Sequence, residues 1–303
     1  MPEIKPSGHN PLMQEIKPSG ENPLRKHFRQ PKIYLTLPSK GKYYPEGSLE
    51  MPENGELPVY AMTAKDELAL KTPDALLNGQ ATVDMIQSCI PNIKDPWKMP
   101  ALDIDACLVA IRIATYGETM EITATPPGMK ETVDYSIDLR QVLDRYTNAV
   151  FNPTFSFDNM EVTTKPLTYM DFSKINMQTF EEQRILALVN TDDMSEDIKL
   201  QRFTESFNKI RDLTLQMVAN SVEKITLLSA EDTIEVTERA FISEFLENSE
   251  KKFFNALQDH IKTEKEKFQV PPMDVRATEE QIEQGVPETF QIPITFDQST
   301  FFA

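Results

Sequence analysis

The sequence contains few of the residues from which common catalytic and metal sites are built. Its 303 residues include three histidines, His9, His27 and His260, and two cysteines, Cys89 and Cys107. The histidines are far apart, and the chain has no His-Glu-x-x-His or Cys-x-x-Cys pair, so it predicts neither a zinc site nor a catalytic histidine. Both cysteines lie in apolar helical patterns, which predicts two reduced, buried thiols and no disulfide.

Long apolar runs and positive charge are also in short supply. No run of about 18 apolar residues is present, and the N-terminal Met-Pro-Glu-Ile-Lys-Pro lacks the apolar core of a secretory signal. Only 31 Lys and Arg residues stand against 48 Asp and Glu residues, which gives a formal net charge of -17. Because like charges repel, binding to nucleic acid or an anionic membrane is disfavoured. We expect a cytoplasmic protein that binds other proteins.

The N-terminal region differs in composition from the rest of the chain. Glycine is scarce, with nine residues, whereas proline reaches 22 and is concentrated near the N-terminus. Residues 3–12 recur at 15–24 with one substitution. This Pro-, Ser-, Gly- and Asn-rich sequence cannot cover a core, so residues 1–30 are expected to form a disordered arm with a tandem repeat. The repeat is either two copies of a docking motif or a duplication in a tolerant tail.

Residues 37–47, here called the turn block, read Leu-Pro-Ser-Lys-Gly-Lys-Tyr-Tyr-Pro-Glu-Gly. Apolar alternation over residues 33–37 predicts a half-buried strand, which the following proline ends because it lacks an N–H for the ladder. Both glycines of the block can adopt positive φ, which predicts two linked turns that present Tyr43 and Tyr44. The Gly-x-x-x-x-Gly-Lys-Ser/Thr spacing of a phosphate loop is absent, which favours a structural turn over a nucleotide site.

Apolar periodicity predicts a mostly helical chain after the turn block. A Thr-x-x-Asp capping box at residues 63–66 begins a short helix. Further helices are expected at residues 72–90, 101–116, 139–146, 167–189, 196–228 and 237–265. A strand is expected at residues 57–62, an extended segment at 150–162, and β-hairpins at 121–139 and 273–296.

These elements predict an α+β fold with a mostly helical body, two small antiparallel β-hairpin modules and a disordered N-terminal arm. Four parts are expected: the flexible arm at 1–30, an α+β domain at 31–164, a helical domain at 165–265, and a C-terminal hairpin and tail at 266–303 that pack back on the body. Similar sequences, Ile-Thr-Ala-Thr at 122–125 and Val-Arg-Ala-Thr at 275–278, indicate that the two hairpins are related modules.

Neighbouring acidic residues are the only candidates for catalysis. The pairs are Asp66 with Glu67, Asp103 with Asp105, and Asp192 with Asp193. Each lies at the start of a predicted helix, where carboxylates complement the helix dipole, so capping is favoured over acid/base catalysis. No Gly-x-Ser-x-Gly elbow or dinucleotide fingerprint occurs. The residues therefore indicate an acidic interaction protein that is not an enzyme, with a hydrolase using these acids as the less favoured alternative.

Five sequence blocks point to a known family. They are Leu-Pro-Ser-Lys-Gly-Lys-Tyr-Tyr-Pro at 37–45, Leu-Leu-Asn-Gly at 76–79, Ser-Cys-Ile-Pro-Asn-Ile-Lys-Asp-Pro-Trp at 88–97, Ile-Arg-Ile-Ala-Thr-Tyr-Gly at 111–117, and Thr-Phe-Asp-Gln-Ser-Thr-Phe-Phe-Ala at 295–303. Together they resemble the baseplate hub subunit family of T4-like contractile-tailed phages, the gene twenty-six product and its relatives. The resemblance runs from about residue 31 to residue 303.

This resemblance implies a non-enzymatic part in building the central hub of the tail baseplate. The implied partners are the hub, the tape-measure protein and the lysozyme-bearing hub component, and the implied locations are the host cytoplasm during assembly and the virion tail baseplate. The protein would act either as a hub subunit or assembly factor, or as a transient assembly chaperone absent from the mature virion.

The hairpin turns depart from the family pattern. Many members carry a Cys-x-x-Cys pair in each hairpin turn, and the two pairs together could supply a four-thiolate zinc site. The corresponding turns at residues 125–130 and 277–282 contain no cysteine. No metal or cofactor is therefore expected here, and the hairpins must hold together by pairing and packing.

Partner binding is expected to use Phe- and Met-rich helical faces, the turn block and the two ends of the chain. The basic, aromatic residues 24–29 would either meet an acidic partner surface or stay solvated. The arm and the C-terminal tail are expected to become ordered on contact with partners. The candidate partner-binding residues are Phe28, Tyr43, Tyr44, Phe301 and Phe302.

Overall fold

The computed structural model describes residues 28–70, 79–189, 195–228, 233–270, 272–294 and 301–302. The chain divides into two units, Met1–Gln30 and Pro31–Ala303. Most of the predicted arm, the start of the helix predicted at 72–90, and the acidic pair Asp192 and Asp193 lie outside the described residues. The domain boundaries at 164 and 265 stay predictions.

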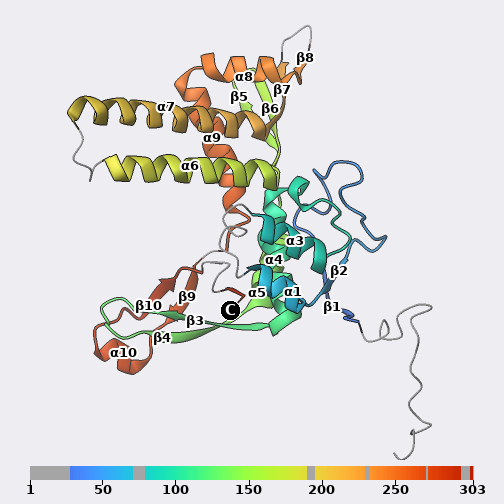
Figure 1. The fold of residues 1–303 in the computed structure, drawn as a ribbon, viewed down its shortest axis with the longest axis vertical. Helices are drawn as coiled ribbons and strands as arrows, with labels where there is room; N and C mark the ends of the chain where they lie inside the picture. The colour runs from blue at the N-terminus through green and yellow to red at the C-terminus, as the bar shows by residue number, and fades with distance from the viewer. Residues whose placement is uncertain are drawn as a thin grey trace, which may run out of the picture. The chain divides into compact units, whose positions relative to one another are not determined.

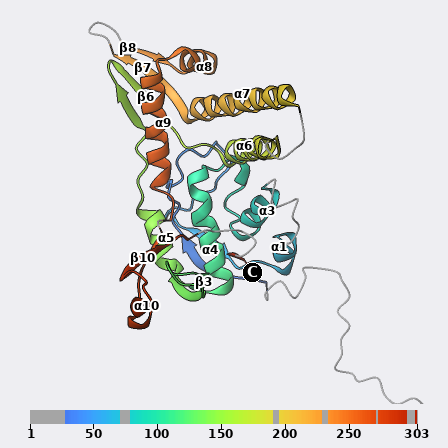
Figure 2. The same ribbon diagram turned by 90° about the vertical axis from the view of Figure 1, so that its left-hand side faces the viewer.

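The second unit has the predicted α+β fold, and its largest core surrounds helix α4 (Ile104–Tyr116). Helix α4 is buried on most of its surface, as its apolar sequence predicts. It contacts α3 (Gln80–Cys89) and α5 (Leu139–Asn148), as Figure 2 shows. Strands β1 (Pro31–Leu35) and β2 (Leu57–Tyr60) pair antiparallel beside it. The remaining elements here are α1 (Ala64–Leu70) and two 3₁₀ turns, η2 (Pro96–Lys98) and η3 (Ala101–Asp103).

Both cysteines lie in this main core. Cys89 and Cys107 are buried thiols that form no disulfide, which confirms the prediction made from their apolar surroundings. The helix that begins at the predicted capping box is also confirmed, because Thr63 and Asp66 bond to each other's backbone N–H groups at the start of α1.

A four-stranded antiparallel sheet forms a second core and includes a strand where the sequence predicts helix. Its order is β5 (Thr154–Phe157), β6 (Met160–Thr164), β7 (Val222–Leu228) and β8 (Thr233–Val236). The helix predicted at 196–228 ends at Ser221, so its last seven residues were wrongly assigned. Strand β7 is rich in β-branched residues, and pairing with β6 on one side and β8 on the other overrides the helical spacing.

Two helices cover this sheet where one was predicted. The predicted helix at 237–265 is divided into α8 (Arg239–Asn248) and α9 (Lys251–Glu266). The break is at Ser249 and Glu250, whose backbones are extended, with ψ of 155° and 141°. Phe253 of α9 occupies the centre of the core, where its ring meets those of Phe157 and Phe245.

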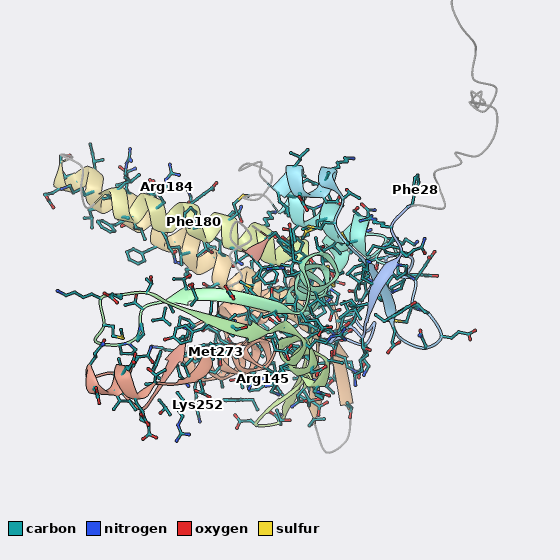
Figure 3. The ribbon with its side chains drawn as sticks, turned by 90° about the horizontal axis from the view of Figure 1, so that it is seen from below. Phe28, Arg145, Phe180, Arg184, Lys252 and Met273 are labelled. Carbon is teal, nitrogen blue, oxygen red and sulfur yellow. The ribbon has the colours of Figure 1, made fainter. Side chains whose placement is uncertain are left out.

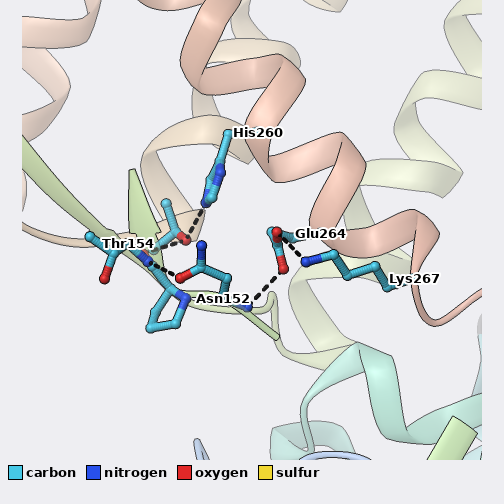
Figure 4. Close-up of polar contacts among 7 residues, drawn as sticks. Asn152, Thr154, His260, Glu264 and Lys267 are labelled. Carbon is cyan, nitrogen blue, oxygen red and sulfur yellow. Dashed lines mark hydrogen bonds and ion pairs between the residues drawn. The ribbon is translucent and has the colours of Figure 1, made fainter. Parts of the chain in front are cut away.

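A buried carboxylate joins α9 to the segment before β5. Glu264 is 4% exposed and accepts hydrogen bonds from the Asn152 backbone N–H at 2.7 Å and from the Lys267 ammonium at 2.6 Å (Figure 4). One turn earlier along α9, His260 lies 3.5 Å from the Thr164 hydroxyl, and its ring is tilted against that of Phe155, with centroids 5.5 Å apart. Burial lowers the pKa of His260 below its ordinary value. These contacts fix α9 against strands β5 and β6.

Replacing Glu264 with alanine should lower the free energy of unfolding by about 2 kcal/mol, because the Asn152 N–H and the Lys267 ammonium would lose their charged acceptor. Glu264→Gln keeps an acceptor and should lose less. Glu266 is an exposed neighbour on the same helix, so Glu266→Ala should change stability by no more than about 0.5 kcal/mol. Urea unfolding of the three variants checks this, and equal losses at 264 and 266 would contradict it.

Both predicted hairpins are confirmed. Strands β3 (Thr119–Ala124) and β4 (Val133–Asp138) pair antiparallel, as do β9 (Met273–Arg276) and β10 (Thr289–Ile292). The segment between β9 and β10 contains the short helix α10 (Glu279–Glu283), started by a capping box between Thr278 and Gln281.

The two hairpins share a third, small core. Phe290 of β10 packs edge-on against Tyr135 of β4, with ring centroids 6.2 Å apart. Apolar residues from both hairpins surround this pair: Ile122, Ala124, Met129, Val275, Ala277, Val286 and Ile292. Packing of side chains thus holds the hairpins together, as predicted for turns without cysteine.

The longest helices, α6 (Tyr169–Val189) and α7 (Glu196–Ser221), lie side by side (Figure 1). Tyr169 anchors the start of α6, because its ring stacks on Trp97 with centroids 5.4 Å apart and its N–H donates to the Met99 carbonyl. Glu182 joins the pair further along by accepting a 2.9 Å hydrogen bond from Lys209 of α7. Among the described residues, no helix is long and apolar enough to cross a membrane.

Candidate functional site

The turn block is held in a backbone conformation that the sequence predicts only in part. Gly41 and Gly47 have φ of 78° and 76°, as expected for linked turns. Lys40 and Tyr43 also have positive φ, of 54° and 70°, although neither is glycine. Positive φ is unfavourable for residues with a Cβ, so contacts from the surrounding structure must maintain it.

The carboxylate of Asp103 provides those contacts. It accepts hydrogen bonds from the Ser39 backbone N–H at 2.7 Å, the Ser39 hydroxyl at 2.5 Å and the Tyr44 hydroxyl at 3.1 Å. Asp103 directly precedes α4, as predicted, but its side chain makes no capping bond there. It instead ties the turn block to the start of the central helix.

Asp103 is fully buried, and the only polar partners described for it are uncharged. Burial raises the pKa of its carboxyl to about 7, although the bonds from Ser39 and Tyr44 lower it. The same surroundings raise the pKa of the Tyr44 hydroxyl well above its ordinary value, with burial as the main cause. A carboxyl held in this way forms a structural anchor, and its hydrogen-bonding capacity is used within the chain.

Asp66 takes a similar structural role. Asp66 bonds to the Thr63 N–H and hydroxyl and to the Ser88 hydroxyl. These bonds tie the start of α1 to α3. Within the described part of the chain, no group of three or more His, Cys, Asp or Glu side chains is arranged to hold a metal ion.

The five predicted partner-binding residues lie in different surroundings. Phe28 is 56% exposed. Tyr43 is half-buried and its ring lies edge-on to Phe151, with centroids 5.8 Å apart, whereas Tyr44 packs against the main core. Phe301 and Phe302 are buried in the main core and pack edge-on against each other. Their part in partner binding stays a prediction.

A separate apolar groove runs along one face of α6, and we call it the α6 groove. Its volume is 730 Å³. Helix α6 supplies one wall. The rest comes mainly from residues 101–108 at the start of α4, the segment 164–167 before α6, and the end of α9 with the residues after it. The end of α7 also contributes. The main apolar lining residues are Leu102, Leu108, Tyr169, Phe172, Met177, Phe180, Ile261 and Phe268.

Two opposite charges lie in the groove among these apolar side chains. Burial raises the pKa of Asp105 to about 6, and the nearby Lys265 opposes this rise. Burial lowers the pKa of Lys265, whose ammonium lies over the Phe172 ring, 4.8 Å from its centroid. The arrangement is suited to recognising an apolar surface that also carries charge.

Comparison with known families assigns the chain to a protein family. A family model described as "T4 bacteriophage base plate protein" matches residues 30–283. The chain belongs to this family. A search of curated proteins and a search of solved structures gave no match. The resemblance to a T4-like baseplate family is therefore confirmed, and membership associates the protein with the phage tail and its proteins.

The sequence contained a signal for the groove of this base plate protein. The α6 sequence has apolar residues on more than one face, although a helix that packs on a single neighbour needs one stripe. The structure buries only Tyr169, Ile175, Glu182 and Val189 of α6. Met170, Met177 and Phe180 remain 50%, 42% and 61% exposed. Excess apolar residues on a long helix thus indicated an open face, but not where the groove would form.

Proposed function

We propose that this base plate protein is a hub subunit or hub assembly factor of a T4-like contractile tail and acts by binding other tail proteins. The exposed apolar face of α6 beside the groove is the observation that supports binding as the mechanism. Contiguous apolar surface is costly to leave in water and is typical of protein interaction sites. The proposed partners are the hub, the tape-measure protein and the lysozyme-bearing hub component.

The predicted contact residues enter this proposal unequally. Phe28 and Tyr43 can meet a partner in the conformation described, because one ring is exposed and the other is half-buried. Tyr44 would have to give up its bond to Asp103. Phe301 and Phe302 would have to leave the main core.

A transient assembly chaperone is the second candidate, favoured by the net charge of -17. An acidic protein with an apolar groove could shield basic or apolar surface of a tail protein until assembly. Such a chaperone would bind the same partners but would leave before the particle is complete.

Co-expression of the tagged protein with each proposed partner from the same phage should yield a stable complex. If the protein co-purifies with none of these partners, the proposed function is contradicted. Mass spectrometry of purified virions then separates the two candidates, because a hub subunit must be present in the mature tail and a chaperone must be absent. A chain that binds its partners and remains in the virion supports the first.

A further inference from the structure

Helix α6 carries two stripes with a seven-residue repeat, and only one of them is covered. The covered stripe contains Ile175, Glu182 and Val189, and Glu182 bonds to α7. The second stripe contains Met170, Met177 and Arg184, with Ser173, Phe180 and Ala187 between them. Because each residue turns the helix by 100°, the second stripe lies roughly 170° around the axis from the first, on the opposite side of α6.

The second stripe has the pattern of a helix-binding seam. Spacings of three and four residues place side chains where a second helix can receive them as knobs in holes. Met177, Phe180 and Arg184 also line the α6 groove, and Figure 3 labels Phe180 and Arg184 along this helix. Methionine suits such a seam because its flexible side chain adapts to a partner.

The dimensions of the groove fit one side of a helix. A helix about 10 Å wide with a pitch of 5.4 Å occupies roughly 420 Å³ per turn. A groove of 730 Å³ can therefore hold the inner half of about three turns. The α6 residues that line it, from Tyr169 to Arg184, span about four turns. The lined length of α6 is thus similar to the length of helix that the groove can hold.

The charges of the groove indicate the chemistry of its occupant. Its cations are Lys165, Arg184 and Lys265, and its anions are Asp105 and Glu181. Lys265 lies near Asp105 and offsets part of its charge, whereas Lys165 and Arg184 form no ion pair with a residue in the described ranges. The three cations of the groove outnumber its two anions, so the groove carries a net charge of +1 in a protein whose net charge is -17. An acidic helix would complement this charge.

We propose that the α6 groove binds an amphipathic helix of another tail protein, with an apolar seam against Met177 and Phe180 and carboxylates facing Arg184, Lys165 and Lys265. This helix would pack against α6 on the side opposite the covered stripe, next to the start of α4 and the end of α9. The proposal rests on the proposed function for the identity of the partner, but the helix chemistry can be tested separately.

The first test uses two labelled synthetic peptides of three heptads. Both have leucine at the seam positions, with glutamate at the flanking positions of one and lysine at those of the other. Fluorescence anisotropy with the full-length protein should show at least tenfold tighter binding of the glutamate peptide. Phe180→Ala should weaken this binding about tenfold, and Arg184→Glu should remove the preference for glutamate. No binding, or equal binding of both peptides, would overturn the proposal.

Two exposed residues away from the groove provide matched controls. Phe241 of α8 is 62% exposed, and Arg211 of α7 is paired with its neighbour Asp212. Phe241→Ala and Arg211→Glu should leave peptide binding unchanged. Thermal unfolding of all four variants shows whether each remains folded. If the controls weaken binding as much as the groove variants, the groove is not the binding site.

The second test uses the tail partner that co-purifies with the wild-type protein. Phe180→Ala and Arg184→Glu should reduce its capture at least tenfold. A partner that binds wild-type and groove variants equally overturns the groove assignment and leaves the proposed function intact. If no tail partner binds but the glutamate peptide does, the proposed function is contradicted, whereas the α6 groove is still supported as a helix-binding site. Sedimentation of the protein alone should show no dimer that depends on Phe180. A wild-type dimer that is lost in Phe180→Ala would instead indicate that a second copy of the chain occupies the α6 groove, which would overturn the proposal.

Discussion

Replacing Asp103 with alanine should lower the free energy of unfolding by about 3 kcal/mol at pH 5, measured by urea unfolding. The substitution removes the acceptor for the Ser39 N–H, the Ser39 hydroxyl and the Tyr44 hydroxyl. A buried donor that loses its partner costs about 1 to 3 kcal/mol, and neighbouring losses are not additive. Asp144 is an exposed aspartate in α5, so Asp144→Ala should change stability by no more than about 0.5 kcal/mol. Equal effects of the two substitutions would contradict the anchor.

The same aspartate should make stability depend on pH. The folded state raises its pKa from 3.8 to about 7, so between these values the folded chain binds more protons than the unfolded chain. The free energy of unfolding should therefore fall as the pH rises from about 4 to about 7 and then level off, by up to about 4 kcal/mol. Asp105, with its pKa raised to about 6, adds to the fall over a narrower range.

Asp103→Asn removes the titrating group while keeping one acceptor. Its unfolding free energy should fall less than that of the wild type between pH 4 and pH 7. Asp103→Asn should also lose less stability relative to wild type at pH 8 than at pH 5, because at pH 8 the wild-type protein buries a charged carboxylate. A variant with an unchanged slope would show that Asp103 does not titrate in this range.

Replacing Phe301 with alanine should lower the free energy of unfolding by about 3 to 5 kcal/mol. Its ring is 1% exposed in the main core, so truncation loses buried apolar surface and leaves a cavity. Phe241→Ala is the matched control, because that ring is 62% exposed and its loss should cost at most about 0.5 kcal/mol. Similar melting temperatures for the two variants would show that the C-terminal ring is not part of the core in solution.

Local sequence patterns were enough to predict those helices and hairpins in which the spacing of apolar residues is regular. The apolar sequence of α4 and the hairpins at 121–139 and 273–296 could be predicted because their spacing and turn residues agree. Strand β7 could not, because its residues continue the spacing of α7 and only pairing with β6 and β8 makes them a strand. The α+β class was thus accessible from sequence, and the four-stranded sheet was not.

The candidate sites show the same limit. The sequence marked the turn block and indicated positive φ at its glycines, but nothing local shows that Asp103, 64 residues after Ser39, accepts its hydrogen bonds. The position of Asp103 just before a helix favoured a capping role. Only the tertiary structure shows that its carboxylate bonds to the turn block. For α6 the number of apolar residues was informative, whereas the groove depends on α4 and α9.

Because the two hairpins share a core, hairpin β3–β4 can be covered only after the C-terminal hairpin β9–β10 has been made. Hairpin β3–β4 is synthesised early, but the residues that cover Ile122 and Tyr135 come from β9, β10 and the segment between them. A nascent chain that stalls before residue 273 would display an uncovered apolar hairpin, a surface that aggregates and that chaperones recognise. Only chains translated through β10 can cover that surface, so incomplete copies would be open to removal before they reach a growing tail.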